Sequence, residues 1–291
     1  MLTSRRAGND APPRRSLTVP APAKINLFLH VTGRRADGYH ELESLFVALD
    51  FGDTVTLARR DDGAIQRTSD LPGVPAAADL AVRAAQALQR DTGSAFGVDI
   101  GVTKRIPEGA GLGGGSSDAA SVLLALNRLW DLDLPRAALL RIGRSLGADV
   151  PFFVFGRPAI ARGIGERLTP VSLPPAWIAL VSPGVKVPTS TIFAAPELTR
   201  DTPSAKMDVF SEGYGRNDLQ AVAVARFPDI GVALAALGQQ ARMTGSGSSV
   251  FAVFATEAEA TAALAEAVQA APGSRGIVAR TLARHPLAAF A

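Results

Sequence analysis

One segment of the 291-residue chain limits the possible folds more than any other: Pro-Glu-Gly-Ala-Gly-Leu-Gly-Gly-Gly-Ser-Ser, residues 107–117. Five of the seven residues from 109 to 115 are glycine, so this segment is poorly suited to the interior of a helix or a strand. From Ser116 to Trp130, by contrast, apolar residues recur at helical spacing along one stripe. The sequence therefore predicts a glycine-rich loop that leads directly into the N-terminus of a helix.

Such a loop suits an anion, because glycine lets backbone N–H groups approach closely and a helix start adds unsatisfied N–H donors. Two serine hydroxyls at its end can contact phosphate oxygens or a phosphate-bound Mg²⁺, with Ser116 the candidate for the metal. A mere flexible linker would not require a helix start directly behind it. We therefore predict a phosphate loop whose binding residues are Pro107, Gly109, Gly111, Leu112, Gly113, Gly114, Gly115, Ser116 and Ser117.

Two common phosphate-binding patterns fit this loop poorly. Three of its glycines match G-x-G-x-x-G, but the preceding segment alternates like a half-buried strand, and Asp131 and Asp133 lie between predicted helices. A dinucleotide-binding fold would need a buried parallel strand before the loop and a second strand ending in an acidic residue. The Walker A pattern needs a lysine before its final hydroxyl residue, and this loop ends Gly-Ser-Ser. An ordinary P-loop is therefore excluded.

Composition and charge exclude several other classes of protein. Cysteine is absent, which rules out disulfides and thiolate chemistry, and three histidines argue against a histidine-rich metal site. No run of 18 apolar residues is present, so we expect a soluble cytoplasmic protein without a membrane partner. The pI of 9.7 suggests nucleic-acid binding, but residues 1–15 carry a net charge of +3 that equals that of the whole chain. We therefore predict a disordered basic extension over 1–15 and no nucleic-acid partner.

Periodicity predicts an α+β chain with two domains, at 16–165 and 166–291, each a mixed or antiparallel sheet with helices on one face. The predicted elements of the first domain are strands at 17–19, 25–31, 55–57, 98–102 and 152–155, with helices at 79–90, 116–130 and 135–147. Those of the second are strands at 177–181, 250–254 and 277–282, helical segments up to about 238, and a helix at 257–270.

Three further segments carry candidate functional residues. Lysine is scarce, at four against 26 arginines, and Lys24 shares one side of an apolar strand with Asn26, so it is either an active-site cation or part of a structural salt bridge. Asp149, beside an apolar run, is a candidate base or simply a turn or N-cap residue. A second Gly/Ser loop at 244–249 either closes over phosphate or makes a tight turn.

These segments, in this order, resemble the GHMP small-molecule kinases. The carriers of the resemblance are Pro-Ala-Lys-Ile-Asn-Leu at 22–27, Arg-Ala-Asp-Gly-Tyr-His at 35–40, the phosphate loop, and Leu-Gly-Ala-Asp-Val-Pro at 146–151. The resemblance covers the chain from about Thr18 onward and implies an N-terminal ribosomal-S5-like domain and a C-terminal ferredoxin-like α/β plait. At 78–80 the chain reads Ala-Asp-Leu where the family often has Asn-Leu. Within the superfamily, the motifs are most similar to the branch that phosphorylates a cytidyl-diphosphate sugar alcohol in non-mevalonate isoprenoid synthesis.

The resemblance implies a role for each candidate. Asp149 would accept or orient the proton of the substrate 2-hydroxyl, and Lys24 would keep that carboxylate ionised and stabilise charge on the transferred phosphoryl group. Mg·ATP would bind the phosphate loop. Tyr39 and Phe193 would sandwich the cytosine while His40 reads its edge. Further substrate contacts are expected from Asn26, Thr189, Gly245, Ser246 and Gly247.

Two alternative functions and the oligomeric state remain open from the sequence. A sister kinase acting on homoserine or mevalonate would leave Tyr39, His40 and Phe193 without a base to bind. A catalytically silent nucleotide-binding module would bind ATP without turnover. Either a monomer or a homodimer is compatible with the sequence.

Overall fold

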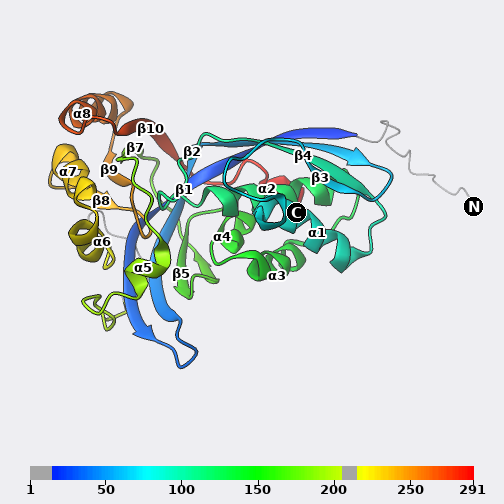
Figure 1. The fold of residues 1–291 in the computed structure, drawn as a ribbon, viewed down its shortest axis with the longest axis horizontal. Helices are drawn as coiled ribbons and strands as arrows, with labels where there is room; N and C mark the ends of the chain where they lie inside the picture. The colour runs from blue at the N-terminus through cyan, green and yellow to red at the C-terminus, as the bar shows by residue number, and fades with distance from the viewer. Residues whose placement is uncertain (1–14, 205–214) are drawn as a thin grey trace, which may run out of the picture.

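The computed structural model describes residues 15–204 and 215–291, so nearly all of the predicted N-terminal extension lies outside the described residues. Two long antiparallel strands, β1 (Ser16–Arg34) and β2 (His40–Arg60), run side by side and end in a hairpin that projects at the bottom of Figure 1. The predicted strands at 17–19 and 25–31 are thus parts of one strand. Gly38, with φ of +90°, allows the turn between β1 and β2.

The described strands form one sheet, ordered β3-β4-β2-β10-β7-β9-β8, with β1 and β5 also pairing with β2 and β6 pairing with β5. The remaining strands are β3 (Ile65–Arg67), β4 (Gly97–Thr103), β5 (Ala159–Gly163), β6 (Arg167–Pro170), β7 (Trp177–Ser182), β8 (Arg242–Met243), β9 (Val250–Phe254) and β10 (Arg275–Leu282). The expectation of a separate sheet in each domain is wrong, because Thr281 and Leu282 at the end of β10 pair with Leu49 and Ala48 of β2. The domain boundaries themselves remain a prediction.

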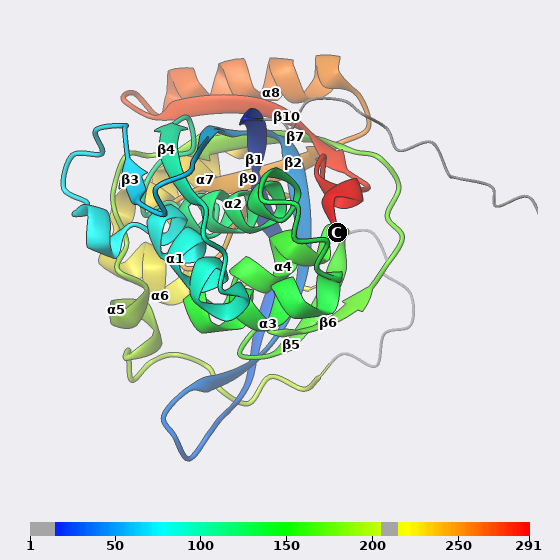
Figure 2. The same ribbon diagram turned by 90° about the vertical axis from the view of Figure 1, so that its right-hand side faces the viewer.

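Helices cover this sheet in two groups, visible at the two ends of Figure 1. The first group is α1 (Leu80–Thr92), α2 (Gly114–Leu129), α3 (Arg136–Leu146) and α4 (Val150–Phe155); the second is α5 (Thr189–Phe193), α6 (Gln220–Arg226), α7 (Pro228–Leu237) and α8 (Glu257–Ala270). α2 lies at the centre of the first group and is buried along most of its length, including Val122, Leu123 and Leu126. Figure 2 shows α2 near the centre of the molecule, and its position matters because the phosphate loop precedes it directly in the chain, with Gly113 as the N-cap.

The sequence analysis predicted a strand where the structure has a helix. Residues 152–155, expected as a strand, belong to α4. Pro151 at the start fits a helix, and Gly156, with φ of +81°, ends it in the left-handed conformation. The run is apolar because Phe152, Phe153 and Val154 are all buried, so no helical periodicity is visible in the sequence.

Within residues 15–204 and 215–291, no single helix is long and apolar enough to cross a membrane, although the pair α6 and α7, bent by 119°, would meet that test by length and composition.

The end of the chain returns from β10 to the first helix group. The His285 backbone N–H donates to the Gly156 carbonyl at 2.8 Å, and Arg136 Nη2 donates to the Ala288 carbonyl at 2.5 Å. His285 is 3% exposed; its Nδ1 accepts from the Leu287 backbone N–H at 3.1 Å, and its Nε2 has no partner among the described residues. Burial, together with the positive charge of Arg136, lowers the pKa of His285 to about 4.

We expect His285 to make folding sensitive to acid. Its pKa is lower in the folded than in the unfolded chain, so the unfolded chain binds the proton first and stability falls as the pH drops from about 6.5 toward 4. The shift corresponds to about 3 kcal/mol in the free energy of unfolding. In His285→Asn the side-chain oxygen can still accept from the Leu287 N–H but does not titrate. Urea unfolding at pH 7.5 and 4.5 should show a difference about 2–3 kcal/mol smaller in the variant than in the wild type. An equal pH difference in both proteins would contradict this assignment.

Candidate functional site

A cleft of about 1130 Å³ lies between the two groups of helices and collects almost every candidate residue. It is lined by β1 and β2, the phosphate loop, the start of α2, Asp149, α5 and the second Gly/Ser loop. The sequence candidates in its lining are Lys24, Asn26, Tyr39, His40, Pro107, Gly109, Gly111, Leu112, Gly113, Gly114, Gly115, Ser116, Asp149, Thr189, Phe193, Gly245, Ser246 and Gly247. Ser117 is the one candidate that does not line it.

The phosphate loop has the backbone shape that its glycines predicted. Gly109, Gly111 and Gly113 all have φ between +64° and +77°, a region that other residues enter only at a cost. Gly113 is the N-cap of α2, so the unsatisfied N–H groups of the helix start face the cleft. A concave set of backbone donors at a helix start is suited to an anion such as a phosphate chain.

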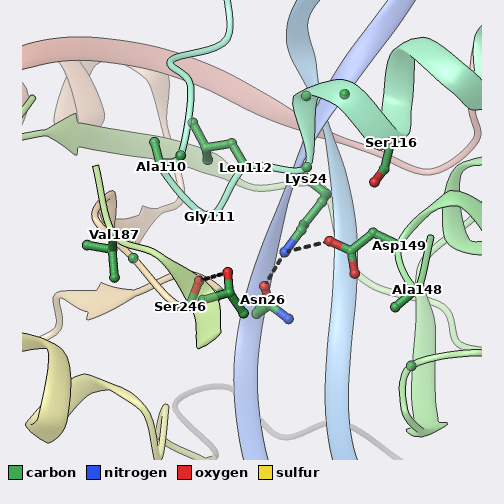
Figure 3. Close-up of a pocket in the computed structure, with 18 of the residues that line it drawn as sticks. Lys24, Asn26, Ala110, Gly111, Leu112, Ser116, Ala148, Asp149, Val187 and Ser246 are labelled. Carbon is green, nitrogen blue, oxygen red and sulfur yellow. Dashed lines mark hydrogen bonds and ion pairs between the residues drawn. The ribbon is translucent and has the colours of Figure 1, made fainter. Parts of the chain in front are cut away.

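The two serines that end the loop have different positions. Ser116 lines the cleft and is drawn in Figure 3 on the same side as Asp149. Ser117 is fully buried, and its hydroxyl donates to the Pro22 carbonyl at 2.6 Å, which fixes α2 against β1. Of these two serines, Ser116 is therefore the one placed to contact a ligand in the cleft.

Lys24 is buried and held in a fixed direction. It is 3% exposed, and its Nζ donates to Asn26 Oδ1 at 2.6 Å and lies 3.6 Å from Asp149 Oδ2 (Figure 3). The ammonium also lies 5.2 Å from the centre of the Phe46 ring. The backbone N–H of Lys24 donates to the Leu112 carbonyl of the phosphate loop at 3.0 Å. The structure therefore brings a cation, a carboxylate and the phosphate loop together in one place.

Asn26 orients Lys24 and is itself fixed by two hydroxyl groups. Its Nδ2 donates to Ser44 Oγ at 2.7 Å, so its Oδ1 points toward Lys24. Its backbone N–H donates to Thr244 Oγ1 at 2.9 Å. Both hydroxyl residues are buried; Ser44 was not identified from the sequence, and Thr244 was noted only as part of the second Gly/Ser loop. Single serines and threonines carry no pattern that marks them as partners of a distant residue.

Asp149 is the N-cap residue of α4, but its side chain makes no cap hydrogen bond. The carboxylate is one-third exposed and points into the cleft, with Oδ2 on the side of Lys24 (Figure 3). This geometry argues against the turn or capping role that the sequence left open. A partly exposed carboxylate beside a cation can accept a proton from a bound hydroxyl group.

The second loop (residues 244–249) packs against the phosphate loop. The Ser249 N–H donates to the Ala110 carbonyl at 3.1 Å, and Ser246 Oγ lies 2.8 Å from Thr189 Oγ1 of α5. The amide of Asn217 donates to the Met243 and Gly245 carbonyls at 2.7 and 2.8 Å. The loop therefore connects the two helix groups at the edge of the cleft.

Aromatic side chains gather at the end of the cleft near the β1–β2 turn. The rings of His40 and Phe193 lie 5.0 Å apart, and Tyr39, 61% exposed, also lines the cleft. An exposed tyrosine beside two further rings is suited to a planar ligand. Burial and the positive charges of Arg200 and Arg34 lower the pKa of His40, so the ring is neutral at neutral pH.

A buried ionic cluster lies behind the start of α2. Lys104 Nζ contacts Asp53 and donates to Asp118 Oδ2 at 2.7 Å. Burial raises the pKa of Asp118 to about 7 against the opposing effect of the lysine. Lys104 and Asp118 line the cleft beside Gly114. The scarcity of lysine was a signal for Lys104, whereas Lys206 lies outside the described residues.

The site contains groups for binding an anion and moving a proton but no acidic metal cage. Within the described residues, no three side chains of the types His, Cys, Asp or Glu gather closely enough to hold a metal ion. A divalent cation brought in by phosphate groups would find the Ser116 hydroxyl and the Asp149 carboxylate on the same side of the cleft.

Comparison with protein families gives two matches in succession along the chain. Residues 79–157 match the model described as GHMP kinases N terminal domain, and residues 196–272 match GHMP kinases C terminal. The chain is 56% identical over 278 residues to the 4-diphosphocytidyl-2-C-methyl-D-erythritol kinase of Thiobacillus denitrificans, covering 94% of this chain and 99% of that protein. It is 54% identical over 288 residues to the enzyme of the same name from Cupriavidus necator, covering 96% and 98%.

Solved structures agree with this relationship. A crystal structure of 4-(cytidine 5'-diphospho)-2C-methyl-D-erythritol kinase has a TM-score of 0.75 at 37% identity and covers 91% of this chain and 99% of its own. A homoserine kinase from Cytophaga hutchinsonii, at 18% identity, has a TM-score of 0.67 over 96% of this chain and 98% of its own, which shows a shared fold alone. The predicted α+β fold with two GHMP kinase domains is confirmed.

Proposed function

Because the chain belongs to the 4-diphosphocytidyl-2-C-methyl-D-erythritol kinases, a family of GHMP kinases, we propose that its cleft transfers the terminal phosphoryl group of ATP to the 2-hydroxyl of that cytidyl substrate. The observation that carries the proposal is the meeting of Lys24, Asp149 and the phosphate loop in one cleft. The protein is an ATP-dependent small-molecule kinase whose activity belongs to the non-mevalonate route to isoprenoids.

The reaction needs positioning and charge stabilisation more than covalent chemistry. The substrate hydroxyl oxygen forms a bond to the γ-phosphorus, the bond from that phosphorus to the β,γ-bridging oxygen breaks, and ADP leaves. The hydroxyl proton passes to Asp149, whose carboxylate makes no cap hydrogen bond and faces the cleft beside Lys24. Lys24, directed by Asn26, stabilises negative charge on the transferred group.

ATP occupies the phosphate loop with its phosphate chain against the backbone N–H groups at the start of α2. The left-handed glycines and the N-cap position of Gly113 support this placement. The Ser116 hydroxyl, which lines the cleft, would be the side-chain oxygen available to a Mg²⁺ bound to the nucleotide, and that ion would supply neutralisation of phosphate charge. Ser117 does not contact the nucleotide and acts indirectly, by fixing α2 against β1.

The cytidyl group of the substrate occupies the aromatic end of the cleft. Tyr39 and Phe193 provide faces for the base and His40 a polar edge. Thr189 and the second loop lie between this end and Lys24, where a diphosphate linker would pass. A homoserine- or mevalonate-type acceptor would leave the aromatic groups unused.

The proposal is tested by measuring ADP release with Mg·ATP and four acceptors: the cytidyl substrate, homoserine, mevalonate and water. We expect turnover with the cytidyl substrate at least about a thousandfold above that with homoserine, mevalonate or water, because a site built for hydrogen bonding and stacking rejects ligands that lack those groups. Phosphorus NMR of the product identifies the hydroxyl that is phosphorylated. Faster turnover of homoserine or mevalonate would reassign the protein, and ATP binding without any turnover would leave a nucleotide-binding module.

A further inference from the structure

Arg200, which the sequence analysis did not identify, lies directly behind the aromatic end of the cleft. Its Nε donates to His40 Nε2 at 3.1 Å. Its two terminal nitrogens donate to four backbone carbonyls, those of Phe193 at 3.1 Å, Ala195 at 2.6 Å, Pro196 at 3.5 Å and Leu198 at 2.9 Å. One guanidinium therefore connects the first residue of β2 to the end of α5 and the segment that follows it.

This contact determines which nitrogen of His40 carries the proton. A guanidinium can only donate, so Nε2 of His40 must accept. Burial and the charges of Arg200 and Arg34 lower the pKa of His40 and keep its ring neutral. The single ring proton is then on Nδ1. His40 lines the cleft, and no hydrogen bond within the described residues uses its Nδ1.

A fixed N–H donor distinguishes between pyrimidine bases. Cytosine has an acceptor at N3, whereas uracil has an N–H at the same position. A donor held toward N3 forms a hydrogen bond with cytosine and meets another donor in uracil. Leaving two such groups unpaired in a partly buried site has a larger effect on selectivity than adding one more apolar contact.

We propose that Arg200 is a positioning residue for base selection: it holds His40 as the Nδ1–H tautomer and fixes the backbone that carries Phe193, so that the cleft selects cytosine over uracil. This inference rests on the proposed cytidyl-binding function. It assigns to Arg200 an effect on which base is bound and no part in phosphoryl transfer.

The first test compares wild type with Arg200→Met on the cytidyl substrate and on its uridyl analogue. In the variant we expect kcat/KM for the cytidyl substrate to fall about 10- to 100-fold, chiefly through KM, and the cytidyl-to-uridyl preference to fall at least about tenfold. Turnover at saturation should change less than about threefold, because Lys24 and Asp149 are untouched.

A matched control is available in Arg226, which also contacts the α5 segment but not His40. Its Nη1 donates to the Thr191 carbonyl at 2.9 Å, and its Nη2 to Glu197 Oε1 at 3.0 Å. Arg226→Met should leave both KM and the base preference unchanged. Arg200→Lys serves as a second variant if the methionine protein folds poorly, because an ammonium keeps the charge but cannot bond to His40 and the four carbonyls together.

The second test observes the tautomer directly by nitrogen NMR of the histidine rings. Wild-type His40 should show its proton on Nδ1, whereas His285 provides an internal reference of the opposite kind, because its Nδ1 accepts from the Leu287 N–H. Arg200→Met should release His40 toward the Nε2–H form. In a His40→Ala background the same substitution should leave the base preference unchanged, as a double-mutant cycle requires.

The inference would be overturned by a folded Arg200→Met protein that keeps the wild-type base preference and an unchanged His40 tautomer. It would also be overturned if adding Arg200→Met to the His40→Ala protein abolished the base preference that remains in His40→Ala. Failure of the proposed function looks different, since the wild type would then not turn over the cytidyl substrate at all. The NMR measurement needs no substrate and separates the two cases.

Discussion

Asp149→Asn should lower kcat by about a thousandfold while leaving the KM for ATP within about threefold of the wild-type value. Asparagine has the same shape as aspartate but cannot accept the proton of the substrate hydroxyl. It also removes the negative charge that lies 3.6 Å from the Lys24 ammonium. Because the Asp149 side chain caps no helix N–H, the substitution should not unfold α4. Steady-state rates of ADP release, with thermal unfolding measured alongside, test both statements.

A suitable control for this substitution is Asp61→Asn. Asp61 is 68% exposed and pairs with Arg59 at 3.4 Å, away from the cleft lining. Its replacement should leave kcat within about twofold, since exposed ion pairs contribute little. If Asp149→Asn kept more than a tenth of the wild-type kcat with an intact fold, Asp149 would not be the proton acceptor, and the positioning by Lys24 and the phosphate loop would have to account for the rate.

Local sequence patterns predicted the phosphate loop and most of the elements around it. α8 was predicted with its observed bounds, and the helix behind the loop was placed within two residues, because glycine punctuation and helical periodicity act over short distances. α4 was mistaken for a strand, because a buried six-residue run shows no period. The continuous sheet was missed, because the pairing of β10 with β2 joins residues more than 230 positions apart.

Some residues of the candidate site were likewise predicted from local motifs, and others were found only from the structure. Lys24, Asn26 and Asp149 belong to local motifs whose resemblance to GHMP kinases marked them, and the structure brings them to one cleft. Ser44 acts on Asn26 across the β1–β2 pair and Arg200 acts on His40, 160 residues away, and neither carries a local pattern. Ser117 belongs to the motif but is turned toward Pro22, a direction that depends on how α2 packs against β1. Sequence reasoning thus found residue types suited to the chemistry, whereas orientation required the packed fold.

The phosphate loop should tolerate no side chain at Gly111. A β-carbon there would lie 2.2 Å from the Thr244 carbonyl oxygen and 3.1 Å from that of Gly247, at a φ of +77°. Gly111→Ala must therefore push the second loop away from the phosphate loop, at the point where Thr244 also contacts Asn26. We expect kcat/KM for ATP to fall by at least about a hundredfold, since small displacements of a positioned group have effects of this size.

Alanine at positive φ also loses folding free energy through backbone strain, whatever its neighbours are. A substitution at Gly273 measures that loss alone. Gly273 has φ of +84°, but a β-carbon there would have nothing within 4 Å. Gly273→Ala should therefore lose only about 1 kcal/mol of stability and keep wild-type kinetics. Gly111→Ala carries the same backbone cost, so any additional loss of kcat/KM comes from displacement of the second loop. Equal kinetics in the two variants would mean that the close packing of the two loops is not required for ATP binding or phosphoryl transfer.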